Sequence, residues 1–338
     1  MVKKNIVVVG CGPMGLRHTE AIEKSKTLNL IGVSDIDSTK KGYFLEKGIS
    51  FSRNWKRYIE NSDIDGLVIS TNGPSHKDLT LEAIKLGVKN ILCEKPMATS
   101  LDDASKMINL CKKNNVRLAI NHSRRWMQSY INLKKLLDKK IIGDIKHLSY
   151  QFGGGQLASN GGHLWDLARY LSSSDPKSVM AILDSKTSVN PRGKQYSDPG
   201  GYGLIKFTND CRVFFDMKED YSNPFFLEIM GSHGRILIDE KSNQWDIFAR
   251  SKENWNLPIK VRTKLVKIPF KSTKVNMIDA SKNAIEELVS RRKISCKGED
   301  GFSSLEVSVA AHESHKSENK FVDLPLNKNQ RKIRYSFT

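Results

Sequence analysis

The chain has 338 residues, of which 27% are charged, and its 55 Lys and Arg against 37 Asp and Glu give a formal net charge of +18. That length suits two compact domains, each with its own core. No apolar run approaches the ~18 to 20 residues that cross a bilayer, and Gly and Pro contribute only 23 and 10 residues. The composition therefore argues against membrane-spanning, collagen-like and disordered classes.

The cysteines and the amino terminus both point to a reducing cytoplasm. Five cysteines are scattered along the chain without a C-x-x-C pair, which predicts neither a disulfide framework nor a zinc site. The apolar run Ile6–Val9 ends at Gly10, too soon for the core of an export signal.

Basic residues are spread over the chain and form only short clusters, such as residues 331–334. This distribution favours a solvated, lysine-rich surface over a nucleic-acid footprint, so we predict no nucleic-acid partner and no membrane partner. The positive field also favours an anionic substrate, which is a weaker inference.

The first 121 residues alternate β-branched runs with segments of helical periodicity. This alternation predicts βαβ units and a doubly wound parallel sheet, a Rossmann domain over residues 1–122. The expected strands are residues 5–9, 28–34, 66–70, 89–93 and 117–121, and the expected helices are residues 14–24, 75–86 and 101–113.

After residue 122 the periodicity changes to short strands bounded by turn pairs. We therefore predict a second domain over residues 123–338, of the α+β class, with an open and mainly antiparallel sheet. Its expected helices are residues 128–138, 162–171, 279–291 and 302–314, and its expected strands are residues 202–207, 212–217, 225–230, 235–239 and 244–248.

A glycine-rich turn follows the first expected strand and opens the first expected helix. In Gly10-x-Gly12-x-x-Gly15, the first glycine suits a tight turn, the second allows close approach of a pyrophosphate, and the third allows the helix to pack on the strand. The strand before it and the helix after it raise this pattern above a chance match, and it predicts a dinucleotide-binding site.

Asp35 lies twenty residues after Gly15, at the end of the second expected strand. A carboxylate there accepts hydrogen bonds from the adenosine ribose and repels a 2′-phosphate, so NAD is predicted over NADP. The structural alternative is a glycine-rich turn that only joins strand to helix, with Asp35 as a helix cap.

Two further motifs resemble one enzyme family. Glu94-Lys95-Pro96 follows the strand expected over residues 89–93, and a glycine-rich segment runs from Gly153 through His163 to Asp166. Together they resemble the glucose-fructose oxidoreductase and inositol dehydrogenase family, often written Gfo/Idh/MocA. The resemblance extends over nearly the whole chain, including residues 71–76, 124–126 and 298–301.

This resemblance implies NAD(P)-dependent oxidation or reduction at a secondary alcohol or ketone carbon of a sugar, cyclitol or nucleotide-linked sugar. It also implies that Lys95 and His163 carry the proton chemistry, and removal of hydride from an alcohol does need a partner for the hydroxyl proton. Considered alone, Lys95 could be a loop lysine and His163 a structural histidine. The predicted cofactor-binding residues are Gly10, Gly12, Pro13, Met14, Gly15, Asp35, Ile36, Thr71, Asn72, His76, Glu94 and Lys95.

The chain departs from the family pattern at Ser159, where the family usually has an aspartate four residues before its histidine. Serine keeps a hydroxyl but lacks the charge that would stabilise an imidazolium. Asp166 could orient His163 from the same helix face, or it could pair structurally. Because of Ser159, a non-catalytic, dinucleotide-binding regulatory protein on the same fold is the alternative function.

Arg124 and Arg125 begin the second domain, and their forked donors suit a substrate carboxylate or phosphate, or else an interdomain salt bridge. We assign no metal, and we expect His312 and His315 to lie on the surface. An exposed antiparallel sheet would need covering, which predicts a homodimer or homotetramer. The predicted substrate-binding residues are Arg124, Arg125, Ser159, Asn160 and Asp166.

Overall fold

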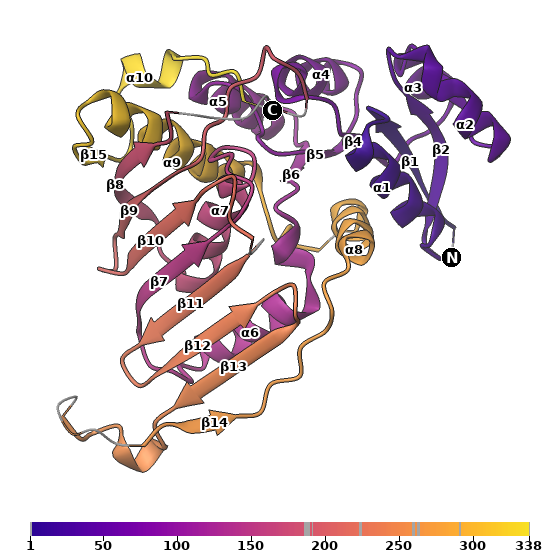
Figure 1. Cartoon of the computed structure of the whole chain (residues 1–338). Helices are drawn as coiled ribbons and strands as arrows, with labels where there is room; N and C mark the ends of the chain where they lie inside the picture. Colours follow the sequence, from indigo (N-terminus) through magenta and orange to yellow (C-terminus); the bar gives the residue numbers. More distant parts are fainter. Residues whose placement is uncertain are drawn as a thin grey trace. The chain divides into compact units, whose positions relative to one another are not determined.

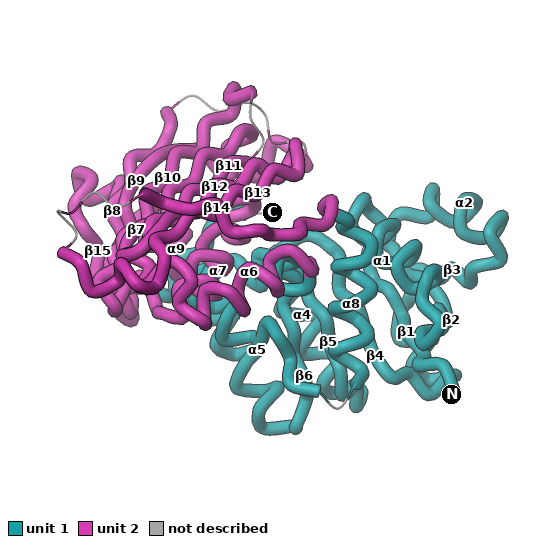
Figure 2. The backbone as a smooth tube through the Cα atoms, turned by 90° about the horizontal axis from the view of Figure 1, so that it is seen from below, with its two compact units in different colours: residues 1–126, 276–305, 331–338 teal, residues 127–275, 306–330 magenta. Residues whose placement is uncertain are grey.

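The computed structural model describes residues 2–185, 190, 192–222, 225–258, 261, 264–290 and 292–337 (Figure 1). The chain divides into two compact units, which Figure 2 shows in different colours. Unit 1 consists of Met1–Trp126, Asn276–Leu305 and Arg331–Thr338, and unit 2 of Met127–Val275 and Glu306–Gln330. Two late segments, Asn276–Leu305 and Arg331–Thr338, therefore belong to the first unit, whereas the sequence predicts a single second domain over residues 123–338.

Unit 1 is built on a six-stranded sheet in the order β3-β2-β1-β4-β5-β6. Every neighbouring pair is parallel. The strand order runs outward from β1 to β3 on one side and from β4 to β6 on the other, as in a doubly wound sheet. Side chains of the central strand, including Ile6, Val7 and Val8, are fully buried, as expected of a sheet covered on both faces. The strands are β1 (Lys4–Val9), β2 (Leu28–Ser34), β3 (Phe51–Ser52), β4 (Gly66–Ile69), β5 (Asn90–Cys93) and β6 (Arg117–Ile120).

The helices of unit 1 cover this sheet. α1 contacts α8, and α4 contacts α5; right-handed crossovers on the two sides of the β1–β4 switch place these pairs on opposite faces. α5 shows why such a segment is helical: the Ser100 hydroxyl accepts the Asp103 N–H at 3.2 Å, and lysines occupy its last turn. The helices are α1 (Pro13–Glu23), α2 (Lys41–Glu46), α3 (Lys56–Asn61), α4 (Gly73–Lys85), α5 (Leu101–Lys113) and α8 (Met277–Val289).

Unit 2 is built on a nine-stranded sheet in the order β14-β13-β12-β11-β7-β10-β9-β8-β15. Its pairs are antiparallel except for β7 with β10. Helices α6 and α7 lie along one face (Figure 1). The strands are β7 (Ile145–Gln151), β8 (Pro176–Leu183), β9 (Gly201–Phe207), β10 (Arg212–Met217), β11 (Phe226–Gly231), β12 (Gly234–Asp239), β13 (Gln244–Ala249), β14 (Val266–Ile268) and β15 (Val322–Asp323).

The remaining helices complete the chain. α9 begins in unit 1 and continues in unit 2. Of the predicted helix over residues 279–291, Arg291 lies outside the described residues. None of the helices in the described ranges is long and apolar enough to cross a membrane. These helices are α6 (Gln128–Asp138), α7 (Gly161–Ser172), α9 (Gly298–Lys316) and α10 (Lys328–Lys332).

The predicted fold class is confirmed: a parallel, Rossmann-like sheet is followed by a mainly antiparallel one. Elements not foreseen include the short β3 and α2, and the strands β7 and β8.

Candidate active site

The carboxyl ends of β1, β2, β4 and β5 lie along one edge of the six-stranded sheet. Backbone hydrogen bonds continue past the strands and tie these ends together: the Gly10 N–H donates to the Ser34 carbonyl at 2.8 Å, and the Glu94 N–H donates to the Ile69 carbonyl at 2.9 Å. In doubly wound sheets, ligands bind outside this edge, at the switch in strand order. The glycine turn, Asp35 and Glu94 therefore share the edge that suits a dinucleotide.

The three glycines of the turn differ in what surrounds them. Gly10 has a φ of +97°, and an added Cβ would lie 2.6 Å from the Ser70 carbonyl carbon. A Cβ on Gly15 would lie 1.9 Å from the Gly10 oxygen, whereas a Cβ on Gly12 would have no atom of the described residues within 4 Å. Gly10 and Gly15 thus serve the turn and its packing, and Gly12 leaves open space beside the α1 N-terminus, where an anion is favoured.

Asp35 fastens the glycine turn to the end of β2. Its carboxylate accepts the Cys11 N–H at 2.6 Å and the Asp37 N–H at 2.9 Å. The following short helix, Ser38–Lys40, is capped by Asp37 rather than by Asp35. The Thr39 hydroxyl hydrogen bond lowers the pKa of Asp37. The structural alternative, in which Asp35 is a helix cap, is therefore wrong for this helix. Ile36, also predicted to bind the cofactor, is 83% exposed.

His76 joins the two loops that follow β4 and β5. Its ring is buried, with Nδ1 2.9 Å from the Pro96 oxygen and Nε2 3.0 Å from the Thr71 oxygen. Carbonyl oxygens only accept, so both contacts are hydrogen bonds only when the imidazole carries both protons. Asn72 is the N-cap residue of α4. His76 thus ties together the loops that contain Thr71 and Lys95.

Glu94 is a buried carboxylate at the end of β5, immediately before Lys95. His18 Nε2 lies 2.7 Å from its Oε1, and the Asn121 amide donates to the same oxygen at 2.6 Å. Burial alone would raise the pKa of Glu94, but the hydrogen bonds and charge of His18, with Asn121 and Lys95, lower it to about 2. The Lys95–Pro96 peptide bond is cis.

Sequence reasoning missed His18 and Asn121. His18 follows Gly15 by three residues, on the face of α1 that faces the sheet. A buried polar residue inside an apolar helix stripe is the signal that could have singled it out.

Arg124 and Arg125, which were predicted to bind substrate, lie in the short helix Ser123–Trp126 of unit 1. The Arg125 guanidinium is buried and donates to the Ser295 carbonyl at 2.7 Å and to Asp300 at 3.2 Å, all within unit 1. The ion-pair alternative therefore describes Arg125, although its partner lies in the same unit. Arg124 is half-buried, and its role toward a substrate stays a prediction.

Two further predicted cofactor-binding residues follow Gly12. Pro13 occupies the first turn of α1, and the Met14 sulfur lies 3.1 Å from an Arg17 nitrogen.

The second motif lies in unit 2, where it leads into α7. The Asp198 carboxylate accepts the Ala158 and Ser159 N–H groups, each at 2.8 Å, and so fixes the turn before the helix. Asp198 was not foreseen from sequence. His163 stands half-exposed in the first turn of α7, three residues before the buried Asp166. The Asn160 amide donates to the Gly155 carbonyl at 3.1 Å.

Other chemically reactive groups lie elsewhere. All five cysteines are buried, free thiols, and the described part of the chain holds no cluster of three or more His, Cys, Asp or Glu suited to a metal. The expectation of a surface position is wrong for His312, which is only partly exposed on α9. Burial, reinforced by the charge of Lys316, lowers its pKa to about 4.

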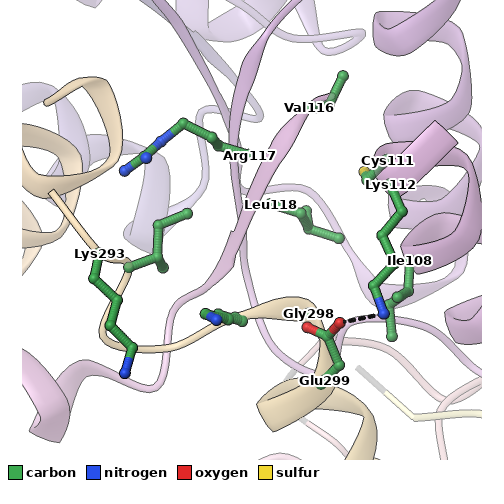
Figure 3. A pocket seen from close by; sticks show the side chains of 11 residues that line it. Ile108, Cys111, Lys112, Val116, Arg117, Leu118, Lys293, Gly298 and Glu299 are labelled. Carbon is green, nitrogen blue, oxygen red and sulfur yellow. Dashed lines mark ion pairs between the residues drawn. The ribbon is translucent and has the colours of Figure 1, made fainter. Parts of the chain in front are cut away.

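A separate cavity of about 290 Å³ lies in unit 1, between the end of α5, the start of β6 and the start of α9 (Figure 3). Lys112 and Glu299 form an ion pair at its side, 2.7 Å apart. Arg117, at the amino end of β6, also lines it. None of the predicted site residues lines it, so it is distinct from the edge described above.

Comparison with known proteins decides the family. A family model described as an oxidoreductase family with an NAD-binding Rossmann fold matches residues 4–122, and the model for its C-terminal alpha/beta domain matches residues 148–324. The chain belongs to the GFO/IDH/MocA oxidoreductase family. It is an oxidoreductase with an NAD-binding domain, which confirms both the resemblance and the predicted cofactor.

Individual GFO/IDH/MocA relatives agree with this membership. Glucose-6-phosphate 3-dehydrogenase of Bacillus subtilis is 31% identical over 68% of this chain and 72% of that protein. Myo-inositol 2-dehydrogenase of Thermotoga maritima is 24% identical over 69% of this chain and 75% of that protein. An Agrobacterium radiobacter oxidoreductase solved in complex with NAD+ shares the fold, with a TM-score of 0.78 and 20% identity over 95% of this chain and 98% of that one.

Proposed function

We propose that the protein transfers hydride between NAD and a secondary alcohol or ketone carbon of a sugar, cyclitol or nucleotide-linked sugar. The observation that carries this proposal is the sheet edge of unit 1, where the glycine turn, Asp35 and Glu94-Lys95 follow parallel strands. The relatives named as sugar and inositol dehydrogenases support the substrate class. We assign cofactor binding to residues 1–122 and substrate binding to residues 123–338.

The residues of the edge fit the proposed cofactor. The open space at Gly12 and the N-terminus of the eleven-residue α1 suit a pyrophosphate. Asp35 is only partly buried, so its oxygens suit ribose hydroxyls, and its charge disfavours the 2′-phosphate of NADP. When bound, NAD supplies the hydride acceptor or donor, and the remaining chemistry falls to the protein.

Lys95 and His163 divide the proton chemistry in our proposal. The Lys95 ammonium donates a hydrogen bond to the reacting oxygen and stabilises negative charge as it develops there. His163 takes up or returns the hydroxyl proton, because imidazole titrates near neutral pH. The charge of Lys95 in turn helps to keep the neighbouring Glu94 ionised.

We further propose an anionic sugar, such as a sugar phosphate, as the preferred substrate. The net charge of +18 attracts anions, and Arg124 is the candidate for a forked contact with a phosphate or carboxylate. The similarity to a dehydrogenase named for glucose 6-phosphate supports this choice.

Self-association is proposed through the outer face of the nine-stranded sheet. Tyr202 and Met230 on this sheet are 44% and 37% exposed, and Phe214 and Phe248 are only partly covered within the chain. The strand register places these side chains on one face of the sheet, on β9, β10, β11 and β13, and a second copy would cover that face. The five free thiols support a reducing compartment such as the cytoplasm.

The test is a nicotinamide absorbance assay with NAD and a panel of phosphorylated sugars, neutral sugars, inositols and sugar nucleotides. We expect turnover with at least one ring alcohol, and higher kcat/KM for a phosphorylated sugar than for its neutral counterpart. Tight NAD binding with no turnover on any member of the panel, in either direction, would instead favour the non-catalytic regulator.

A further inference from the structure

Two hydrogen-bond donors converge on a single oxygen of Glu94. His18 Nε2 and the Asn121 amide approach Oε1 at 2.7 and 2.6 Å, while Oε2 accepts no hydrogen bond from any described residue. Glu94 is 4% exposed and His18 is fully buried. The carboxylate is therefore held by one oxygen, and the other oxygen retains its full capacity to accept.

Among the described residues, Glu94 is the one polar contact of the His18 ring. Its other nitrogen, Nδ1, is buried and has no hydrogen-bond partner in the described parts of the chain. Burying an imidazole with one nitrogen unsatisfied costs free energy. The hydrogen bond to Glu94 therefore explains why a histidine is buried at position 18.

These three residues link the helix that follows the glycine turn to the ends of β5 and β6. His18 lies on α1, the helix that the glycine turn opens, and Glu94 directly precedes Lys95. Asn121 follows β6, and its N–H donates to the Cys93 carbonyl at 2.9 Å. The Glu94 side chain is therefore fixed from the strand on one side and from the helix at the phosphate end on the other.

Building on the proposed function, we propose that His18 and Asn121 are positioning residues that hold Glu94 so that its Oε2 accepts a hydroxyl of the nicotinamide-side ribose. A buried carboxyl without such donors tends to take up a proton, and a protonated oxygen loses acceptor capacity. Because the donors keep Glu94 ionised and oriented, they act on the ligand through it and need not touch the ligand themselves.

The test measures binding, so it does not depend on turnover. Dissociation constants of NAD, ADP-ribose and ADP are measured calorimetrically for the parent protein, His18→Leu and Asn121→Leu. ADP lacks the second ribose, whereas ADP-ribose contains it. We expect each variant to weaken NAD and ADP-ribose by about tenfold, the scale of one charged hydrogen bond, and to leave ADP within about twofold.

Two further variants separate positioning from general damage. His18→Gln keeps a side-chain N–H donor and should recover most of the lost NAD affinity. Thr80→Val is the matched control, because Thr80 is a fully buried residue of α4 whose hydroxyl has no partner in the described structure. It should leave all three dissociation constants unchanged.

Equal weakening of ADP and NAD would overturn the proposal, because it would mean general damage to the edge. Unchanged binding of all three ligands would also overturn it, as would failure of both leucine variants to fold, which would assign the pair to stability. Absence of turnover in the sugar panel contradicts the proposed function and leaves this selective loss of affinity intact, so the two failures are distinguishable.

Discussion

The imidazole of His18 and the carboxylate of Glu94 lie 2.7 Å apart although 76 positions separate them in the sequence. Their contact links the helix behind the glycine turn to the residue before Lys95. The contact holds an ionised carboxylate inside unit 1, so the free energy of unfolding should depend on the charge of Glu94.

Replacing Glu94 with Gln should lower the free energy of unfolding at pH 7. Its pKa falls from the usual 4.5 to about 2 in the folded protein, so ionised Glu94 contributes stability in full above pH 4.5. That contribution, about 3 kcal/mol, disappears as the pH falls toward 2. Urea unfolding at pH 7 and pH 3 should show a large difference from the parent that shrinks on acidification. A difference independent of pH would contradict the assigned charge.

His312 should produce a linkage of the same sign in a higher pH range. Its folded pKa of about 4 lies below the ordinary 6.5, so the unfolded chain binds the proton more tightly, and stability falls as the pH drops from 6.5 to 4. His312→Gln should flatten this part of the profile of unfolding free energy against pH. His315→Gln, at an exposed position on the same helix, should flatten it less, because the charge of His315 is only a smaller contribution to the lowered pKa of His312. A parental profile in His312→Gln would contradict the assigned shift.

Alanine substitutions in the glycine turn should separate binding from folding. In Gly15→Ala the new methyl would lie 1.9 Å from the Gly10 oxygen, so the protein should lose at least about 3 kcal/mol of stability. In Gly12→Ala the methyl lies within 4 Å of no atom of the described residues, so thermal stability should stay near that of the parent while NAD affinity falls. Gly42→Ala, equally open and on α2, should change neither NAD affinity nor fold. If Gly12→Ala kept the NAD affinity of the parent protein, the assignment of pyrophosphate binding to this turn would be wrong.

Self-association should depend on the outer face of the nine-stranded sheet. Light scattering after gel filtration should give a mass at least twice the 38.2 kDa of one chain. Phe214→Lys should reduce this mass, because a lysine cannot be buried there without a partner. Tyr43→Lys, at an exposed position of unit 1, should not. A monomeric parent protein would rule out the proposed assembly.

Local patterns in the sequence were enough to predict the strands and helices with strong periodicity. The strand Leu28–Ser34 and the helices Leu101–Lys113 and Gln128–Asp138 match the predicted bounds. β3 and α2 have two and six residues, too few for a period to emerge. β7 pairs in parallel with β10, more than sixty positions later, and such pairing leaves no local signal.

The site residues followed the same rule. The glycine turn and Glu94-Lys95 are contiguous motifs, so they could be identified directly. His18, Asn121 and Asp198 depend on partners 76, 27 and 39 positions away, and the pairing of Arg125 with Asp300 spans 175 positions. Such partners are set by packing of the whole unit, which no local pattern records.

The most direct test of the account is single-turnover hydride transfer by Lys95→Met, compared with Lys89→Met. Lys89 lies just before β5 and is exposed, so it is a matched control with the same change of charge. We expect Lys95→Met to retain NAD binding and to lose at least about a hundredfold in the rate of NADH formation, the usual scale of a lost proton-transfer or oxyanion donor. Lys89→Met should keep the parental rate. Equal rates in the two variants would contradict the assignment of Lys95 to the chemistry.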